Sequence, residues 1–185
     1  ICSVTKTSIQ KSMENVENFY SDKISVENAP FFLPYLSGER TPHNDPHIRG
    51  SFHSIKTTTD ATNLQYAVIE GVSFGILDGV NSVLKVNSDF ENIFMVGGGS
   101  RSSFWNSFLS SLLNRKLSVC EQSEFGAALG VARLAMYADE SRTSKKDIIK
   151  EIKVDKEYKP KPNDIDLLMK RYLIWRDLYT RNKKN

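Results

Sequence analysis

Three consecutive glycines, Gly97-Gly98-Gly99, separate a short apolar run from an amphipathic segment. The run at 92–96 has the continuous apolar character of a buried strand, and residues 116–120 indicate another short strand. The segment at 102–113 predicts a helix with these apolar residues inward: Phe104, Trp105, Phe108, Leu109, Leu112 and Leu113. Because strands and helices alternate, we expect an α/β fold with helices on both faces of a sheet.

The glycine turn between the strand and the helix is a candidate ligand site. Glycine has no side chain, so a ligand can reach the backbone there. The helix that follows presents unpaired amides and the positive end of its dipole, which suits an anion or the ribose and phosphate of a nucleotide. Such turns also occur only to reverse the chain, so the local pattern leaves both interpretations open. No Gly-Lys-Ser/Thr follows, which excludes a Walker A loop, and the lack of G-x-G-x-x-G disfavours a dinucleotide fold.

The first half of the chain predicts shorter elements and one long helix. Residues 9–19 have modest helical character, and 30–36 is an apolar run between prolines, typical of an edge strand or an extended connector. A loop at 37–49 precedes a short strand within 50–55. Thr59 or Asp60 can cap a helix that continues to about residue 85.

The long helix should bury one face, made of Leu64, Ala67, Val68, Gly71, Val72, Gly75, Ile76, Gly79, Val80 and Val83. Its three glycines lie four residues apart on one side, each costing up to ~1 kcal/mol of helix propensity. We interpret them as points where another backbone approaches closely; a broken helix is the alternative. Glu70 and Asp78 are expected to have exposed or hydrogen-bonded structural roles.

The second half continues the alternation. A helix at 124–138 has Gly126 and Gly130 spaced for tight packing, and Thr143 or Ser144 caps a short charged helix that ends near residue 152. Pro160 and Pro162 interrupt the chain before a last helix at 164–181.

Composition excludes several classes of protein. The 185 residues suit one domain with a tail, and neither a membrane-length apolar run nor a signal peptide is expected, so a cytoplasmic setting is the default. Residues 141–185 hold 14 Lys and Arg against 7 Asp and Glu. The acidic residues are interleaved, and an apolar stripe in this tail needs a core, so nucleic-acid binding is disfavoured. Cys2 and Cys120 are interpreted as free thiols.

The loop at 37–49 raises two further questions. His43, His47, His53 and Asp45 match no usual zinc spacing, so packing and hydrogen bonding are the preferred interpretation and no metal site is expected. Glu39 and Arg40 are interpreted as a local ion pair or a contact between lobes rather than as catalytic groups.

Four motifs, in this order, resemble the carboxy-terminal lobe of the FGGY family of carbohydrate kinases. The first is Gly-Glu-Arg-Thr-Pro-His at 38–43, followed by Asn44-Asp45-Pro46 and Arg49-Gly50; this run is similar to that of the members that phosphorylate D-xylulose. The others are Ala-Val-Ile-Glu-Gly-Val-Ser-Phe at 67–74, Gly-Gly-Gly-Ser-Arg-Ser at 97–102 and Phe-Gly-Ala-Ala-Leu-Gly-Val-Ala at 125–132. The similarity covers about residues 31–138, and the last helix also fits the helix that closes the family's fold.

The resemblance implies an α/β lobe of an actin-like (ribonuclease H-like) ATPase, with a mixed sheet flanked by helices, as a fragment. It divides the chain into a polar lead-in at 1–30, a nucleotide-binding lobe at 31–158 and a closing helix at 159–185. ATP with Mg²⁺ and a small-molecule sugar are the implied ligands. The implied nucleotide-binding residues are Gly97, Gly98, Gly99, Ser100, Arg101, Ser103 and Ser54.

In the family, an aspartate of the amino-terminal lobe removes the proton of the sugar hydroxyl, and positioning and charge neutralisation supply most of the rate enhancement. No catalytic or metal-binding residue is therefore expected in this chain. The isolated chain should be inactive, and its main partner is the missing amino-terminal lobe; nucleic acid and membrane are not expected as partners, and a homodimer is left open.

Some positions depart from the family pattern. Ser54-Ile55 replaces a usual Gly-Leu near the phosphates, and Ser107 and Ser111 replace a usual Gln and Asp. Two alternatives therefore stay open: another sugar or polyol kinase, acting on gluconate, ribulose or glycerol, and a non-catalytic nucleotide-binding protein of the actin-like fold.

Overall fold

A computed structural model describes residues 6–86, 92–121, 123–138 and 153–183. The chain divides into two compact units, one made of Ile1–Phe90 with Pro162–Asn185 and the other of Glu91–Lys161. Each unit is described by itself. The charged helix expected between residues 143 and 152 lies outside the described residues.

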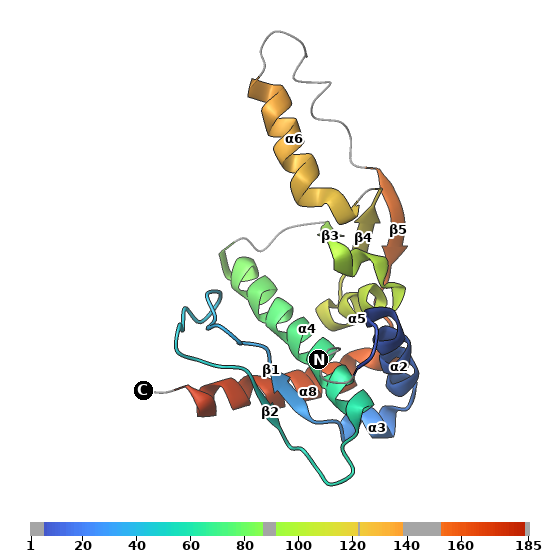
Figure 1. Ribbon diagram of the computed structural model, residues 1–185, viewed down its shortest axis with the longest axis vertical. Coiled ribbons are helices and arrows are strands. Elements are labelled where there is room, and N and C mark those ends of the chain that lie inside the picture. Colours follow the sequence, from blue (N-terminus) through green and yellow to red (C-terminus); the bar gives the residue numbers. More distant parts are fainter. Residues whose placement is uncertain (1–5, 87–91, 122, 139–152, 184–185) are drawn as a thin grey trace. The chain divides into compact units, whose positions relative to one another are not determined.

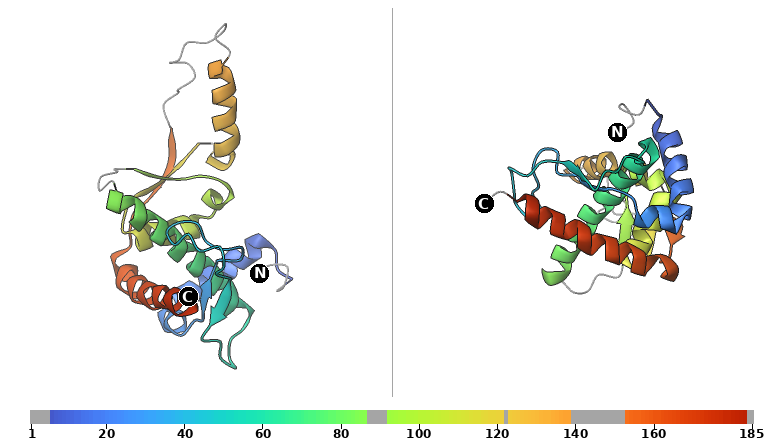
Figure 2. Two further views of the ribbon diagram at one scale, coloured as in Figure 1. Left: turned by 90° about the vertical axis from the view of Figure 1, so that its left-hand side faces the viewer. Right: turned by 90° about the horizontal axis from the view of Figure 1, so that it is seen from below.

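In the described part of the first unit, four helices accompany a small hairpin of strands. Its elements are α2 (Ile9–Ser21), α3 (Lys23–Glu27), β1 (Phe31–Leu33), β2 (Ser51–His53), α4 (Ala61–Val86) and α8 (Pro162–Asn182). The two strands pair antiparallel, with Phe32 opposite Phe52. Helix α4 packs against β1 and α2, and α8 packs against β1 and α4 (Figures 1 and 2). The predicted elements of this half are confirmed, with boundaries shifted by a few residues.

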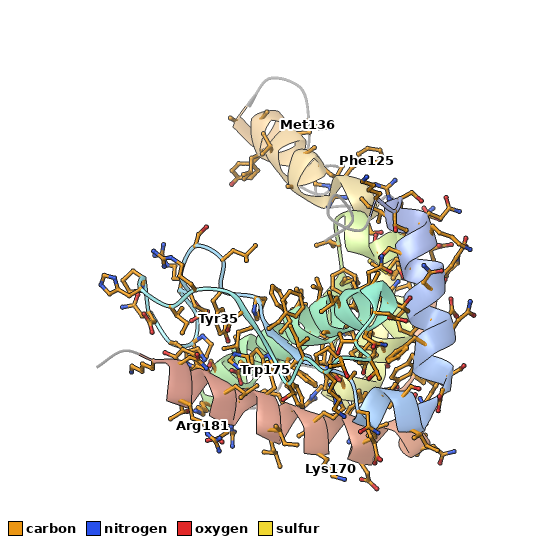
Figure 3. The ribbon with its side chains drawn as sticks, turned by 60° about the horizontal axis from the view of Figure 1, so that its bottom comes forward. Tyr35, Phe125, Met136, Lys170, Trp175 and Arg181 are labelled. Atoms are coloured by element: carbon orange, nitrogen blue, oxygen red, sulfur yellow. The ribbon has the colours of Figure 1, made fainter. Side chains whose placement is uncertain are left out.

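The core of this unit is aromatic. Tyr66, Phe74 and Trp175 are fully buried, and the Trp175 Nε1–H donates to the Phe32 carbonyl at 2.7 Å. Figure 3 shows Trp175 directed inward from α8, whereas Lys170 and Arg181 lie on the outer side of that helix. Pro162 occupies the first position of α8, where proline costs no hydrogen bond.

The predicted glycine contacts on α4 are confirmed at one position. A Cβ on Gly71 would collide with the carbonyl oxygen of Phe32, so β1 crosses the helix there at backbone distance. Gly75 would make only an ordinary contact with Pro34, and Gly79 faces open space. The helix is continuous, which excludes the alternative of a broken helix.

The predicted buried face of α4 was mostly wrong. Only Ala67 and Gly71 of that set are fully buried, and Val83 is exposed. The buried face instead includes polar residues, Glu70 and Asp78, and α8 supplies hydrogen-bond donors to both, which lowers the cost of burying them. By length and composition α4 could cross a membrane. One such helix is weak support for a membrane protein, and the burial of its aromatic residues identifies it as a core helix.

Glu70 lies in a buried ion pair with Arg171. The guanidinium donates through Nε and Nη2 to the two carboxylate oxygens, each at 2.6 Å, and the Tyr66 hydroxyl donates to the same carboxylate at 2.7 Å. Arg171 also donates to the backbone carbonyls of residues 27, 29 and 30. The expected hydrogen-bonded structural role of Glu70 is confirmed, and the pair ties α4 to α8.

Side chains of α4 and α8 contact the loop at 37–49. The ring of His43 stacks on Tyr179 with centroids 3.6 Å apart, and its Nε2 lies 3.4 Å from Asp78 Oδ2. Asp78 also accepts a hydrogen bond from the Tyr172 hydroxyl, and Glu39 accepts one from the backbone amide of His43 at 2.8 Å. Among the described residues, no three His, Cys, Asp or Glu side chains come together to hold a metal ion.

The second unit is a three-stranded mixed sheet with helices. Its elements are β3 (Ile93–Met95), the 3₁₀ turn η1 (Gly98–Arg101), α5 (Ser103–Leu113), β4 (Leu117–Cys120), the 3₁₀ turn η2 (Ser123–Phe125), α6 (Gly126–Ala138) and β5 (Val154–Tyr158). Strand β4 lies in the middle, parallel to β3 and antiparallel to β5. The expected strand, glycine turn, helix and strand are confirmed. Strand β5 was not predicted.

Helix α6 buries none of its residues in this unit. Gly126 approaches the Val96 side chain, but Gly130 faces open space, so the tight packing expected along this helix is wrong at Gly130. Two large apolar side chains of α6, Val131 and Leu134, are 67% and 70% exposed.

Candidate functional site

The glycine turn is shaped differently at each of its three positions. Gly97 has φ of +84°, in the region that favours glycine, and its N–H donates to the Ser123 carbonyl at 2.8 Å. Open space lies above Gly97, and only the end of the Arg101 side chain lies near Gly98. Gly99 is instead covered: a Cβ there would lie 2.6 Å from the Trp105 ring and 2.9 Å from Met95. A ligand can therefore approach the backbone at Gly97 and Gly98, as expected, but not at Gly99, where side chains cover it.

A set of serine hydroxyls holds the turn in place. The Ser100 hydroxyl donates to the Gly97 carbonyl at 2.7 Å, and the Ser123 hydroxyl donates to Ser100 Oγ at 2.9 Å. The buried side-chain amide of Asn106 donates to the Ser100 carbonyl at 2.8 Å. These bonds join η1, η2 and α5, so the backbone of Gly97 and Gly98 is held in one conformation.

Helix α5 begins at the edge of this turn. The side chain of Ser102 caps it by accepting a hydrogen bond from the Trp105 amide at 3.2 Å, and Ser103 is its first residue. The N-terminal end of α5, with its partial positive charge, therefore lies directly after the glycines.

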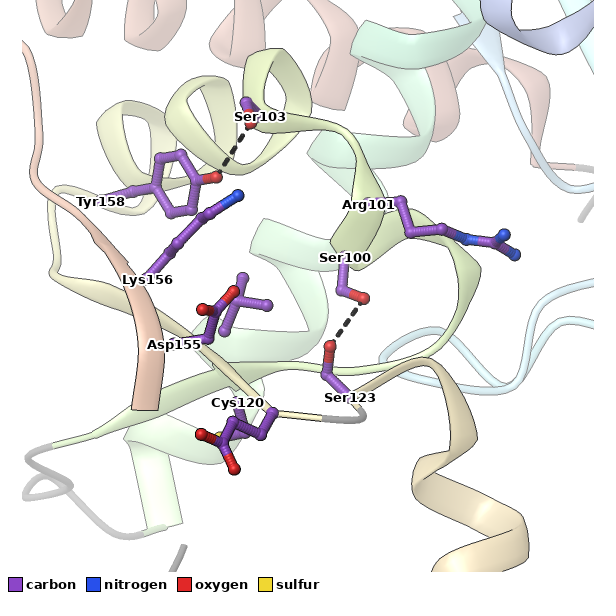
Figure 4. A pocket seen from close by; sticks show the side chains of 10 residues that line it. Ser100, Arg101, Ser103, Cys120, Ser123, Asp155, Lys156 and Tyr158 are labelled. Carbon is purple, nitrogen blue, oxygen red and sulfur yellow. Dashed lines mark hydrogen bonds between the residues drawn. The ribbon is translucent and has the colours of Figure 1, made fainter. Parts of the chain in front are cut away.

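A pocket of about 300 Å³ lies beside the turn (Figure 4). Its lining combines hydroxyl groups, two cations and two carboxylates. It consists of Ser100, Arg101, Ser103, Val119, Cys120, Glu121, Ser123, Asp155, Lys156 and Tyr158. Hydroxyls and side chains of both charges suit a ligand that carries both anionic groups and hydrogen-bond donors, as a nucleotide does.

The structure brings some of the predicted residues to this pocket. Ser100, Arg101 and Ser103 line it, and Gly97 to Gly99 form the turn beside it. Ser54 lies in the other compact unit, where it follows β2 with φ of +61°. Ser54 is not among the residues that line this pocket.

Several lining residues were not predicted. Cys120 is the last residue of β4 and Ser123 comes shortly after it. Ligands of parallel sheets commonly bind at this end of a strand, so the position could have indicated both residues. Asp155, Lys156 and Tyr158 come from β5, and the charged, Pro-bounded sequence around it contains no strand signal. Partial burial raises the pKa of the Cys120 thiol, which favours its neutral form.

Of the serines that depart from the family pattern, Ser111 has a clear structural role. It is fully buried, its hydroxyl donates to the Ser107 carbonyl at 3.1 Å, and its Oγ accepts the Lys161 amide at 3.0 Å. Ser111 therefore anchors the segment after β5 to α5.

Comparison with known proteins gives a consistent set of relatives. The family described as "FGGY family of carbohydrate kinases, C-terminal domain" matches residues 5–138. A xylulose kinase of Staphylococcus epidermidis is 30% identical over 94% of this chain and 35% of its own length, and one of Escherichia coli is 32% identical over 80% and 31%. The chain thus spans about a third of the length of these relatives.

Solved structures share the fold. A xylulose kinase from Brucella ovis superimposes with a TM-score of 0.81 at 30% identity, covering 97% of this chain and 36% of that one. A glycerol kinase of Plasmodium falciparum with ADP gives 0.70 at 19% identity, covering 96% and 34%, and at that identity the likeness shows the fold alone. The chain accordingly has the fold of the carboxy-terminal lobe of actin-like ATPases, as expected.

Proposed function

Since the chain belongs to the FGGY family of carbohydrate kinases, we propose that it is the nucleotide-binding lobe of an ATP-dependent kinase that converts D-xylulose to xylulose 5-phosphate. The observation that carries this proposal is the pocket beside Gly97 and Gly98, at the start of α5.

Each part of this site has a task in the proposed function. The open backbone at Gly97 and Gly98 lets the nucleotide approach the main chain, and the hydroxyl bonds of Ser100 and Ser123 keep that backbone fixed before binding. Preorganised groups of this kind orient a bound nucleotide without losing conformational entropy. The start of α5 favours negative charge nearby.

The Mg²⁺ ion that accompanies ATP would reach the site with its phosphates. Within the described residues, no group of three His, Cys, Asp or Glu side chains could hold this ion. The base that accepts the sugar proton is proposed to lie in the part of the relatives that this chain does not span. The 185-residue chain alone is therefore proposed to be inactive.

Xylulose is preferred as the substrate because the relatives described above at 30% identity or more are xylulose kinases. The alternative of another sugar or polyol is kept because gluconate and glycerol kinases share the fold. Assaying the complete protein with xylulose, gluconate, ribulose and glycerol decides between them. A preference for any sugar other than xylulose would overturn the assignment.

Calorimetry with ADP on the 185-residue chain tests the nucleotide site itself. We expect ADP to bind with one molecule per chain, and ATP-dependent phosphorylation of xylulose to be absent. A chain that is folded but does not bind ADP would contradict the proposal. Phosphorylation of xylulose by the pure chain would contradict the proposed inactivity.

We also propose that the complete protein acts in the cytoplasm.

A further inference from the structure

One wall of the pocket is formed by β5, which lies beyond the residues matched by the family model. In the pairing of β5 with β4, Lys156 is opposite Val119 and Tyr158 is opposite Leu117. Residues opposite each other in an antiparallel pair share a face, and so do residues two apart in one strand. Because Val119 lines the pocket, Lys156 and Tyr158 lie on the pocket side of the sheet.

A bulge in β5 adds a charged side chain to this wall. The pairing steps from Val119 with Lys156 to Cys120 with Val154, so Asp155 is an extra residue. A bulge redirects side chains at the point where it occurs. Asp155 lines the pocket together with its neighbour Lys156, although successive residues of a regular strand point to opposite faces (Figure 4).

Two hydrogen bonds join β5 to α5 and fix the distance between this wall of the pocket and the start of the helix. The Tyr158 hydroxyl donates to Ser103 Oγ at 3.1 Å. The buried hydroxyl of Ser110 donates to the Tyr158 carbonyl at 2.9 Å. In Figure 4, Lys156 extends from β5 in the direction of Ser103, the first residue of α5.

The ammonium group of Lys156 has no ion pair or hydrogen bond among the residues that the structure describes. The side chain of Glu157, next to it, is instead paired with Lys116 at 2.8 Å. The wall thus holds a cation without a partner near the start of a helix, which also favours negative charge. The carboxylates of Asp155 and Glu121 lie in the same lining and suit hydrogen-bond donors such as ribose hydroxyls.

We propose that Lys156 binds a phosphate group of the nucleotide, between β5 and the start of α5. This rests on the proposed function, because it assumes that the pocket beside the glycine turn is the nucleotide site. It assigns the role to a residue outside the glycine motif and outside the matched residues 5–138.

Calorimetric titration of the chain with ADP and with adenosine tests the role of Lys156, since adenosine lacks phosphate. We expect Lys156→Ala to weaken ADP binding by about tenfold, the effect of losing one hydrogen bond to a charged group at an exposed site. The affinity for adenosine should change by less than about twofold, because adenosine has no phosphate for Lys156 to bind. Lys156→Arg should restore most of the ADP affinity because it keeps the charge.

Lys159→Ala is the matched control. It removes the same charge just after the same strand, but Lys159 does not line the pocket. We expect its ADP affinity to equal that of the wild-type chain. Raising the salt concentration should narrow the difference between wild type and Lys156→Ala, because the charges are exposed.

The outcomes separate this inference from the proposed function. ADP binding by Lys156→Ala that equals wild type would overturn the role of Lys156 and leave the nucleotide site in place. An equal loss of ADP and adenosine binding would also overturn it, since that pattern indicates a disturbed pocket rather than a lost phosphate contact. Failure of the wild-type chain to bind ADP would overturn the proposed function and this inference with it.

Discussion

Replacing Arg171 with methionine should destabilise the first unit strongly. The side chains of Arg171 and Glu70 are 3% and 1% exposed, and the guanidinium is bonded to both carboxylate oxygens. Arg171→Met would leave the Glu70 carboxylate buried without a counter-charge. Removing one partner of a buried pair costs about 3–5 kcal/mol. Since natural domains are stable by only about 5–15 kcal/mol, this loss is a large share of the total.

The two tryptophans allow the first unit to be followed alone. Trp175 lies in the core of the first unit and Trp105 lies in the second, so a Trp105→Phe background leaves Trp175 as the fluorescent reporter. Urea denaturation in this background should show a midpoint for Arg171→Met well below that of the parent. The slope of the transition should be unchanged if the mutation acts on stability alone.

Two further variants test the physical reason. The double variant Glu70→Gln with Arg171→Met removes the unpaired charge and keeps an acceptor for Tyr66, so it should be more stable than Arg171→Met alone. Lys170→Ala changes an exposed neighbour on the same helix, 3.8 Å from Glu27, and should shift stability by less than about 0.5 kcal/mol. An Arg171→Met variant as stable as Lys170→Ala would refute the reasoning.

Three other predictions follow from the described geometry. Gly98→Ala should keep the stability of the chain but weaken ADP binding. Gly97→Ala should lower the free energy of unfolding by about 1–2 kcal/mol, because alanine is strained at the positive φ of this position, and should lower the melting temperature with it. Equal melting temperatures for the two variants would contradict this. ADP should slow the alkylation of Cys120 in a Cys2→Ser background, and an unchanged rate would place the ligand elsewhere. The pKa of Asp22 should be lower than 3.8 because the Ser25 hydroxyl and the amides at the start of α3 bond its carboxylate. The stability that this cap adds should therefore be present above pH 3.8 and lost as the pH falls through that lowered pKa. Nuclear magnetic resonance titration should show Ser25→Ala moving the midpoint back toward 3.8.

Much of the fold follows from local patterns in the sequence. The strand before Gly97 and the helix after it are each dictated by apolar spacing, and the structure has them at the expected positions. Helix α8 begins at Pro162, where a break was expected. These features depend on neighbours in the chain, which a sequence shows directly.

The features that could not be predicted depend on partners far along the chain. The buried face of α4 includes Glu70 and Asp78 because Arg171 pairs with Glu70 and the Tyr172 hydroxyl donates to Asp78, about a hundred residues later. For the same reason, the sequence predicted only one side of the pocket. Its glycine turn follows from a local motif, whereas Asp155 and Lys156 reach it through the pairing and bulge of β5.

The most direct test of the account is an ADP titration of the nitrogen-15-labelled chain, followed by the amide resonances of each residue. We expect saturable shifts at residues 97–103 and at Ser123, with smaller shifts in β5 at Lys156. The amides of Tyr66 and Phe74, in the core of the other unit, should serve as unshifted references. Shifts that saturate elsewhere while residues 97–103 stay unchanged would contradict a nucleotide site at the glycine turn.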